Sequence, residues 1–184
     1  MAKQKTTKDE IIKKAVEVFR KQGYYKTSMS DLAKACGLLK GSFYYHFASK
    51  EELMQAVLES VHGYYTHKVF SIAYEKGKTA QQRFEQLFEK QAPIMTEDLA
   101  GCLFGNMTLE TISSNPEFKQ LLQTFFNDWK AAFQHIFEEN HSTEVAKALA
   151  DQSIIEVEGA LMMMRLYDDK TIFEQACLRV AEKL

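Results

Sequence analysis

The sequence predicts an all-α protein made of a small helical head on a larger helical body. Only two prolines and eight glycines interrupt the 184 residues, and no segment shows the alternation of β-branched residues that is typical of a strand. Charge divides the chain: residues 1–50 hold eleven Lys and Arg against four Asp and Glu, whereas residues 51–184 hold twelve against twenty-one. We therefore expect a basic head, residues 1–48, followed by an acidic body, residues 49–184.

Three segments of the head follow the Ser/Thr-x-x-acid pattern of a capping box and predict helix starts: Thr7 to Glu10, Ser28 to Asp31 and Ser49 to Glu52. Gly23 can end the first helix and Gly37 the second, and a short helix over 40–47 follows the glycine turn. Two short helices joined by such a turn and preceded by a longer helix are typical of a helix-turn-helix.

The short helix over 40–47 predicts two different faces. Phe43 and Phe47 are four residues apart, so they share the face that packs on the preceding helices. The opposite surface has side chains that donate hydrogen bonds or stack, and Gly41 allows close approach to base edges. A packing surface within a bundle is the alternative for the Tyr44–Tyr45 pair, but the basic charge and the glycine turn favour contact with DNA.

The stretch over 27–53, "TSMSDLAKACGLLKGSFYYHFASKEEL", resembles the DNA-binding signature of the TetR family of bacterial transcriptional repressors, as does "AVEVFRKQGYYKTS" over 15–28. The resemblance implies phosphate contacts by Thr27, Tyr44, His46 and Lys50, and base-facing positions at Lys40, Gly41, Ser42 and Tyr45. Two residues depart from the family pattern. Leu39 replaces the usual Ser or Thr cap, and Cys36 replaces alanine as a small buried thiol.

The body is expected to continue as helices. Thr79 to Gln82 is a further capping box, Pro93 is expected to bend or end the helix that it opens, and Asn115-Pro116 predicts the cap of a helix over 116–139. Another long helix is expected over 143–167 and a last packing helix over 171–184. Since the helices over 116–139 and 143–167 are apolar on more than one side, they predict a four-helix bundle shared by two chains, and the resemblance implies the same homodimer.

A dimer would place two reading helices about 34 Å, or a multiple of that, apart on a palindromic operator in double-stranded DNA. An effector in the body, pushing on the helix that begins near Lys50, could change this separation and release the DNA. An apolar or aromatic effector is expected, and a cationic one is the alternative. The candidate lining residues share aromatic or sulfur-containing side chains at helical spacing, which also suit an ordinary core: Tyr64, Tyr65, Phe84, Phe88, Met95, Cys102, Phe104, Met107 and Trp129.

Cys102 supports a separate hypothesis. It follows Gly101 at a predicted helix start, where the helix dipole would lower the pKa of the thiol and favour a thiolate. "GCLFGN", over 101–106, also resembles the corresponding stretch of TetR-family members that respond to reactive electrophiles. An ordinary buried thiol is the alternative.

Other function classes have little support. Gly77-Lys78-Thr79 lacks the upstream glycine of a phosphate-binding loop, because Ile72 occupies its place, so we expect no enzyme and no cofactor. Three cysteines without CxxC spacing predict free thiols and no metal site. No segment predicts a membrane span or a leader, so a cytoplasmic location is expected. The alternative function is a DNA-binding factor whose body docks a protein partner, with an architectural or cell-cycle role.

Overall fold

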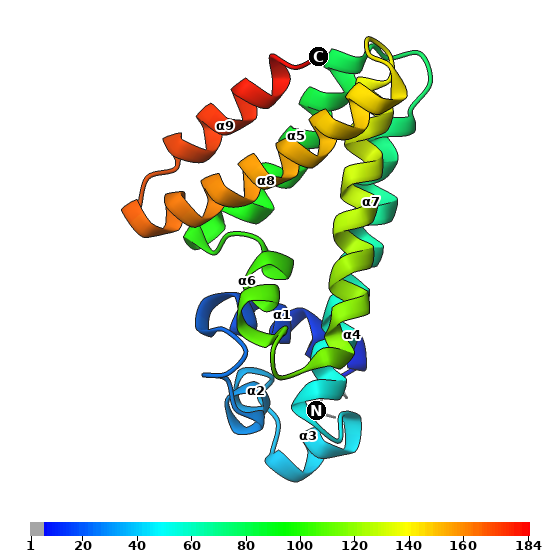
Figure 1. The fold of residues 1–184 in the computed structure, drawn as a ribbon. Coiled ribbons are helices and arrows are strands. Elements are labelled where there is room, and N and C mark those ends of the chain that lie inside the picture. The colour runs from blue at the N-terminus through cyan, green and yellow to red at the C-terminus, as the bar shows by residue number, and fades with distance from the viewer. Residues whose placement is uncertain (1–5) are drawn as a thin grey trace.

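The computed structural model describes residues 6–184, and within this range every regular element is a helix. The head holds α1 (Lys8–Gln22), α2 (Met29–Ala35) and α3 (Lys40–His46). Helix α4 (Lys50–Lys68) begins beside α1 in the head and rises along α7 into the body (Figure 1). The predicted all-α class, with a head on a helical body, is therefore confirmed.

The predicted caps of the head are mostly present. Thr7 and Ser28 form complete capping boxes, and Gly23 ends α1 with a φ of +79°, a conformation that favours glycine. The Ser49 hydroxyl accepts from the Glu52 N–H, but the Glu52 carboxylate accepts from the Ala48 N–H, so this cap lacks the reciprocal bond of a box. These local bonds fix where each short helix starts.

The body contains five α-helices and three short 3₁₀ turns within residues 69–184. Their bounds are η1 (Phe70–Tyr74), α5 (Ala80–Thr96), η2 (Glu97–Leu99), α6 (Leu103–Thr111), η3 (Pro116–Phe118), α7 (Lys119–Phe137), α8 (Thr143–Tyr167) and α9 (Thr171–Ala181). The capping box at Thr79 is confirmed. Helix α5 continues to Thr96, so Pro93 does not end it.

Asn115 and Pro116 occupy the predicted N-cap and first helical positions, but of a short 3₁₀ turn, η3, and not of α7. Asn115 makes no side-chain cap bond: its amide donates to Glu117, and its oxygen accepts from the Tyr25 hydroxyl at 3.3 Å. A 3₁₀ turn therefore precedes α7, which starts only at Lys119. The η1 turn was not expected either, since it has no capping signal.

Helix α7 supplies the centre of the body's core. Its Phe125, Trp129 and Phe133 side chains are fully buried, and their rings pack against residues of η1, α5 and α6. Helix α8 packs along α7, and α9 packs on α8. The wide apolar stripe predicted over 116–139 is thus satisfied within one chain.

The exposed apolar side chains of the body lie elsewhere. Five of them follow one another along α8 and α9: Val145, Ile155, Met162, Leu166 and Leu178. Val145, Ile155 and Met162 belong to the predicted helix over 143–167, and within a single chain they are exposed. Exposed apolar side chains are therefore more frequent on α8 and α9 than on α7. None of the helices described for residues 6–184 is both long and apolar enough to cross a bilayer.

Candidate nucleic-acid interface and ligand cavity

Helix α3 has the two faces that its sequence predicts. Phe43 and Phe47 are 0% and 3% exposed and hold the helix on the head's core. The other side, which we call the α3 face, consists of exposed residues: Lys40, Gly41, Ser42, Tyr44 and Tyr45. Tyr45 is 83% exposed. Tyr45 therefore adds an exposed ring and a hydroxyl to the polar surface of the α3 face.

The ends of α3 differ in their contacts. Leu39, at the N-cap, is 81% exposed and makes no side-chain cap bond, as its identity predicts. His46, at the other end, is half-buried, and its ring meets the Tyr45 ring edge-on at a centroid distance of 5.7 Å. The Lys40 ammonium lies 5.9 Å from the Tyr44 ring centroid, where it remains free to approach a phosphate.

Thr27 and Lys50 are not part of this exposed surface. Thr27 is 1% exposed, and its hydroxyl donates to the Gly23 carbonyl at 2.6 Å, so the side chain implied as a phosphate contact stabilises the turn after α1 instead. The Lys50 ammonium donates to the carbonyls of Tyr24 and Thr27 at 2.9 and 3.1 Å, and it lies 4.2 Å from the Tyr24 ring centroid. At most one of its three N–H bonds remains for a phosphate.

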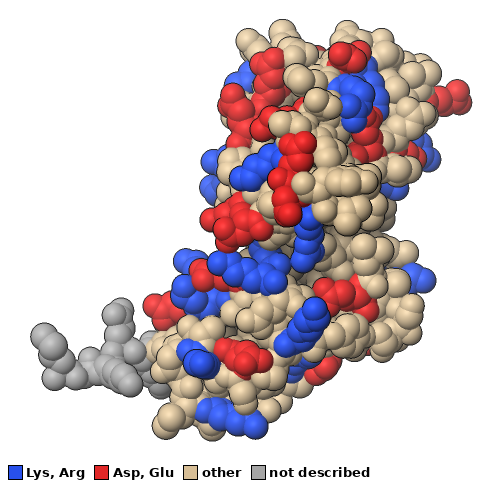
Figure 2. Space-filling model, turned by 90° about the vertical axis from the view of Figure 1, so that its left-hand side faces the viewer, with Lys and Arg blue, Asp and Glu red and all other residues tan. Residues whose placement is uncertain are grey.

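Figure 2 shows how charge is distributed on one side of the molecule. Lys and Arg side chains gather over the head at the lower end and at the junction with the body, while Asp and Glu are more frequent over the upper body. The surface therefore follows the charge asymmetry of the sequence, and the basic end is the one that has the α3 face.

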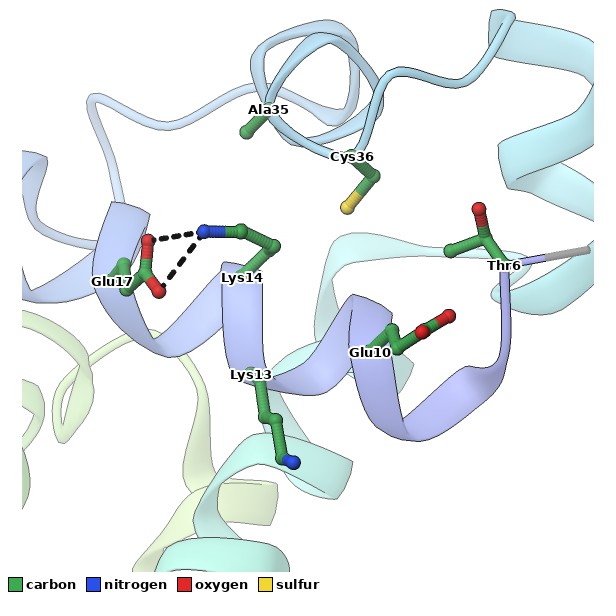
Figure 3. Close-up of a pocket in the computed structure, with 7 residues that line it drawn as sticks. All are labelled: Thr6, Glu10, Lys13, Lys14, Glu17, Ala35 and Cys36. Carbon is green, nitrogen blue, oxygen red and sulfur yellow. Dashed lines mark hydrogen bonds and ion pairs between the residues drawn. The ribbon is translucent and has the colours of Figure 1, made fainter. Parts of the chain in front are cut away.

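A hollow of about 460 Å³ lies between α1 and the end of α2 (Figure 3). Its lining mixes both signs of charge, and Lys14 pairs with Glu17 at 3.0 Å. Cys36 points into it and is half-buried, and burial raises the pKa of its thiol. Because the lining holds two lysines and two glutamates and the thiol is neutral, the hollow shows no preference for a charged ligand.

A second hollow, which we call the neck cavity, lies where the head meets the body and has a volume of about 490 Å³. Its walls come from α1, α4, the end of α5, residues 101–104 and α7. Most of its lining is apolar or aromatic: Ile12, Val16, Val61, Tyr64, Tyr65, Ile94, Cys102, Phe104 and Phe125. A volume and lining of this kind suit a small apolar molecule.

Four of the candidate effector-binding residues line the neck cavity: Tyr64, Tyr65, Cys102 and Phe104. The other five, Phe84, Phe88, Met95, Met107 and Trp129, are buried in the core and do not line it. The sequence did not single out Ile12, Val16 or Ile94, because amphipathic spacing alone does not distinguish a cavity wall from a packed interface.

Cys102 does not have the lowered pKa that was expected. The thiol is buried, and burial, assisted by the neighbouring Glu158 carboxyl, raises its pKa well above the ordinary value. Sγ accepts a hydrogen bond from the Gly105 N–H at 3.4 Å. Desolvation therefore outweighs the helix dipole, and the thiol is neutral near pH 7. Burial also raises the pKa of Glu158, to about 7.

Glu110 of α6 connects the body to the head. Its carboxylate accepts from the backbone N–H groups of Tyr24 and Tyr25 at 2.8 and 3.2 Å. On the other side of α1, Arg20 donates to the Ile94 carbonyl, and Lys21 pairs with Asp98 at 3.1 Å. The sequence did not predict these contacts, since the bonded residues are 74 to 86 positions apart and show no local signal.

Comparison with known protein families agrees with this arrangement. Residues 11–57 match the family of bacterial regulatory proteins named tetR, and residues 80–177 match the C-terminal domain of LmrA/YxaF-like transcriptional regulators. The chain belongs to the TetR family. The match of the second segment alone covers more than half of its length. The chain is therefore a DNA-binding transcriptional regulator.

Individual relatives of this TetR-family regulator span most or all of the chain. The transcriptional repressor DhaR of Mycobacterium sp. strain GP1 is 28% identical over 180 residues, which cover 95% of this chain and 90% of DhaR. The regulator LmrA of Bacillus subtilis is 23% identical over 85% of each chain. A crystal structure of a TetR regulator from Legionella pneumophila superposes with a TM-score of 0.89 over the full length of both chains, at 26% identity.

Proposed function

We propose that this regulator is a repressor that binds a palindromic operator as a homodimer and is released by a small apolar effector. The α3 face is the observation that supports operator binding, because Phe43 and Phe47 hold the helix while Tyr45 and its polar neighbours face outward. DhaR, a repressor, is similar over nearly its whole length. The exposed apolar residues of α8 and α9 would form the dimer interface.

The position of the neck cavity supports control by a ligand. Ile12 and Val16 belong to α1 of the head, whereas Ile94 and Phe125 belong to the body, and all four line the same space. A molecule that fills it pushes on both parts at once, so its binding energy can shift α1 against the body. A solid body would favour docking of a protein partner instead, and the cavity therefore favours the small-molecule function.

The test is selection of bound duplexes from a random DNA pool with the full chain, followed by a salt titration of the best sequence. We expect a palindrome, and we expect affinity to fall steeply as salt rises because Lys side chains displace counterions from phosphates. Equal, weak retention of all duplexes would refute operator binding. Release of a selected duplex by small apolar compounds would then test the effector.

A further inference from the structure

Two polar side chains in the body's core have no hydrogen-bond partner. Gln91 of α5 is fully buried with neither its amide nitrogen nor its oxygen bonded, and the buried indole N–H of Trp129 on α7 is also unpaired. Each such group destabilises a fold by about 1–3 kcal/mol, and native cores contain few of them. An unpaired donor and acceptor inside a ligand-binding body point to a ligand that bonds with them.

Both side chains lie at the same level of the bundle. Contacts at the head end, Arg20 with Ile94 on α5 and Tyr24 with Phe118 before α7, show that the two helices run in opposite directions. Further from the head, Phe88 of α5 packs on Phe133 of α7 with a centroid distance of 6.0 Å.

Gln91 lies three residues after Phe88 on α5, and Trp129 lies four residues before Phe133 on α7, so both are one turn closer to the head than this contact. Although they are level, the indole N–H and the amide oxygen do not bond to each other.

On both helices, the residues one further turn toward the head line the neck cavity. Ile94 of α5 and Phe125 of α7 both line it. Phe104 of α6 stacks on Phe125 with a centroid distance of 3.7 Å, and Trp129 follows at 5.9 Å from Phe125. Phe125 therefore adjoins both the cavity and Trp129, and Ile94, three residues from Gln91, lines the cavity on the facing helix. An effector that displaces these side chains would reach the unpaired polar groups.

The chemistry of this inner end favours an uncharged group. Gln91 offers a donor and an acceptor, and Trp129 a donor. The charged residues that line the neck cavity, Lys13, Glu17 and Arg20, all belong to α1 on the head side. A charged group placed between an amide and an indole would lose its hydration without gaining a counterion.

We propose that Gln91 and Trp129 bind the neutral polar end, a carboxamide or similar carbonyl group, of an effector whose remainder is apolar. This proposal rests on the proposed function, since it places the effector in the neck cavity.

Four probes of similar shape test the proposal by calorimetry: benzamide, toluene, benzoate and benzylammonium. We expect benzamide to bind about tenfold or more tightly than the other three, as one or two buried hydrogen bonds would give. The chain has a single tryptophan, so quenching of its fluorescence reports on Trp129 directly. Equal affinity for benzamide and toluene, or preference for a charged probe, would overturn the proposal.

Gln91→Leu gives the sharper test, with Gln81→Leu, at an exposed position of the same helix, as the matched control. Gln91→Leu is expected to keep or raise the unfolding temperature, because it removes an unpaired amide, and to abolish the preference for benzamide over toluene. A loss of stability with the preference intact would show a structural role and refute the site.

Should Gln91→Leu fail to fold, Trp129→Phe is measured in the same way by calorimetry. Binding of the selected operator duplex is measured in parallel without any probe. This measurement shows whether the proposed operator binding is correct even if the proposed ligand site is not.

Discussion

The head and the body use aromatic residues in opposite ways. In the head, two rings of α3 are buried and two tyrosines are turned outward, so the chemistry lies on the surface of a short helix held by a few core contacts. In the body, the Phe125, Trp129 and Phe133 rings of α7 face inward and Phe125 lines the neck cavity, so the chemistry lies inside long packed helices. The head is thereby suited to a large rigid partner and the body to a small apolar one.

The largest effect is expected from removing the ring that holds α3. Phe43→Ala deletes a fully buried side chain and should lower the free energy of unfolding by about 3–5 kcal/mol. Urea unfolding measures the loss, and hydrogen exchange should show it first in the amides of the head. Equal loss of protection in α7 would contradict the separation of head and body.

A second effect concerns the body, whose stability should depend on pH through Glu158 of α8. Burial raises the pKa of Glu158 from 4.5 to about 7, so the folded chain holds a proton that the unfolded chain loses. Stability contributed by this protonated group is present below pH 4.5 and is lost as the pH rises to about 7, by up to about 3 kcal/mol. Glu158→Gln should remove that slope in denaturation curves recorded between pH 4.5 and 8. An unchanged slope would exclude Glu158 as its source.

A third change acts on the junction between the two regions. Glu110→Ala removes the acceptor of two backbone N–H groups and should lower stability by about 1–3 kcal/mol. It should also weaken the transmission of a ligand's effect from the body to DNA. Glu59→Ala, at an exposed position of α4, is the control. If both variants respond to ligand like the wild type, Glu110 is not a connecting residue.

The smallest effect concerns one cap of the head. Ser28→Ala removes the hydroxyl that accepts from the Asp31 N–H at 3.2 Å and should lower stability by about 1 kcal/mol. Ser28→Thr keeps a hydroxyl that can accept from the Asp31 N–H and donate to the Asp31 carboxylate, and it should restore most of the stability. A thermal melt that shows no difference between the two variants would mean that the α2 cap contributes nothing to the head.

The same contrast explains how much could be predicted. Caps and turns depend on residues a few positions apart, so Thr7, Ser28 and Gly23 marked the head's helices correctly, and the buried face of α3 followed from the spacing of Phe43 and Phe47. Cavity walls, junctions and desolvation depend on residues distant in sequence. Glu110, Gln91 and the raised pKa of Cys102 therefore became visible only in the fold, and the division at residue 48 stays a prediction.

The role of the α3 face is tested most directly by one pair of tyrosines. Tyr45 is 83% exposed on α3 and Tyr74 is 51% exposed on the body, so alanine at either position should leave the core intact. In equilibrium titrations of the selected operator duplex at fixed salt, Tyr45→Ala should lower affinity by about tenfold or more, and Tyr74→Ala should leave it unchanged. Equal affinities for both variants and the wild type would contradict the assignment of the α3 face as the DNA-reading surface.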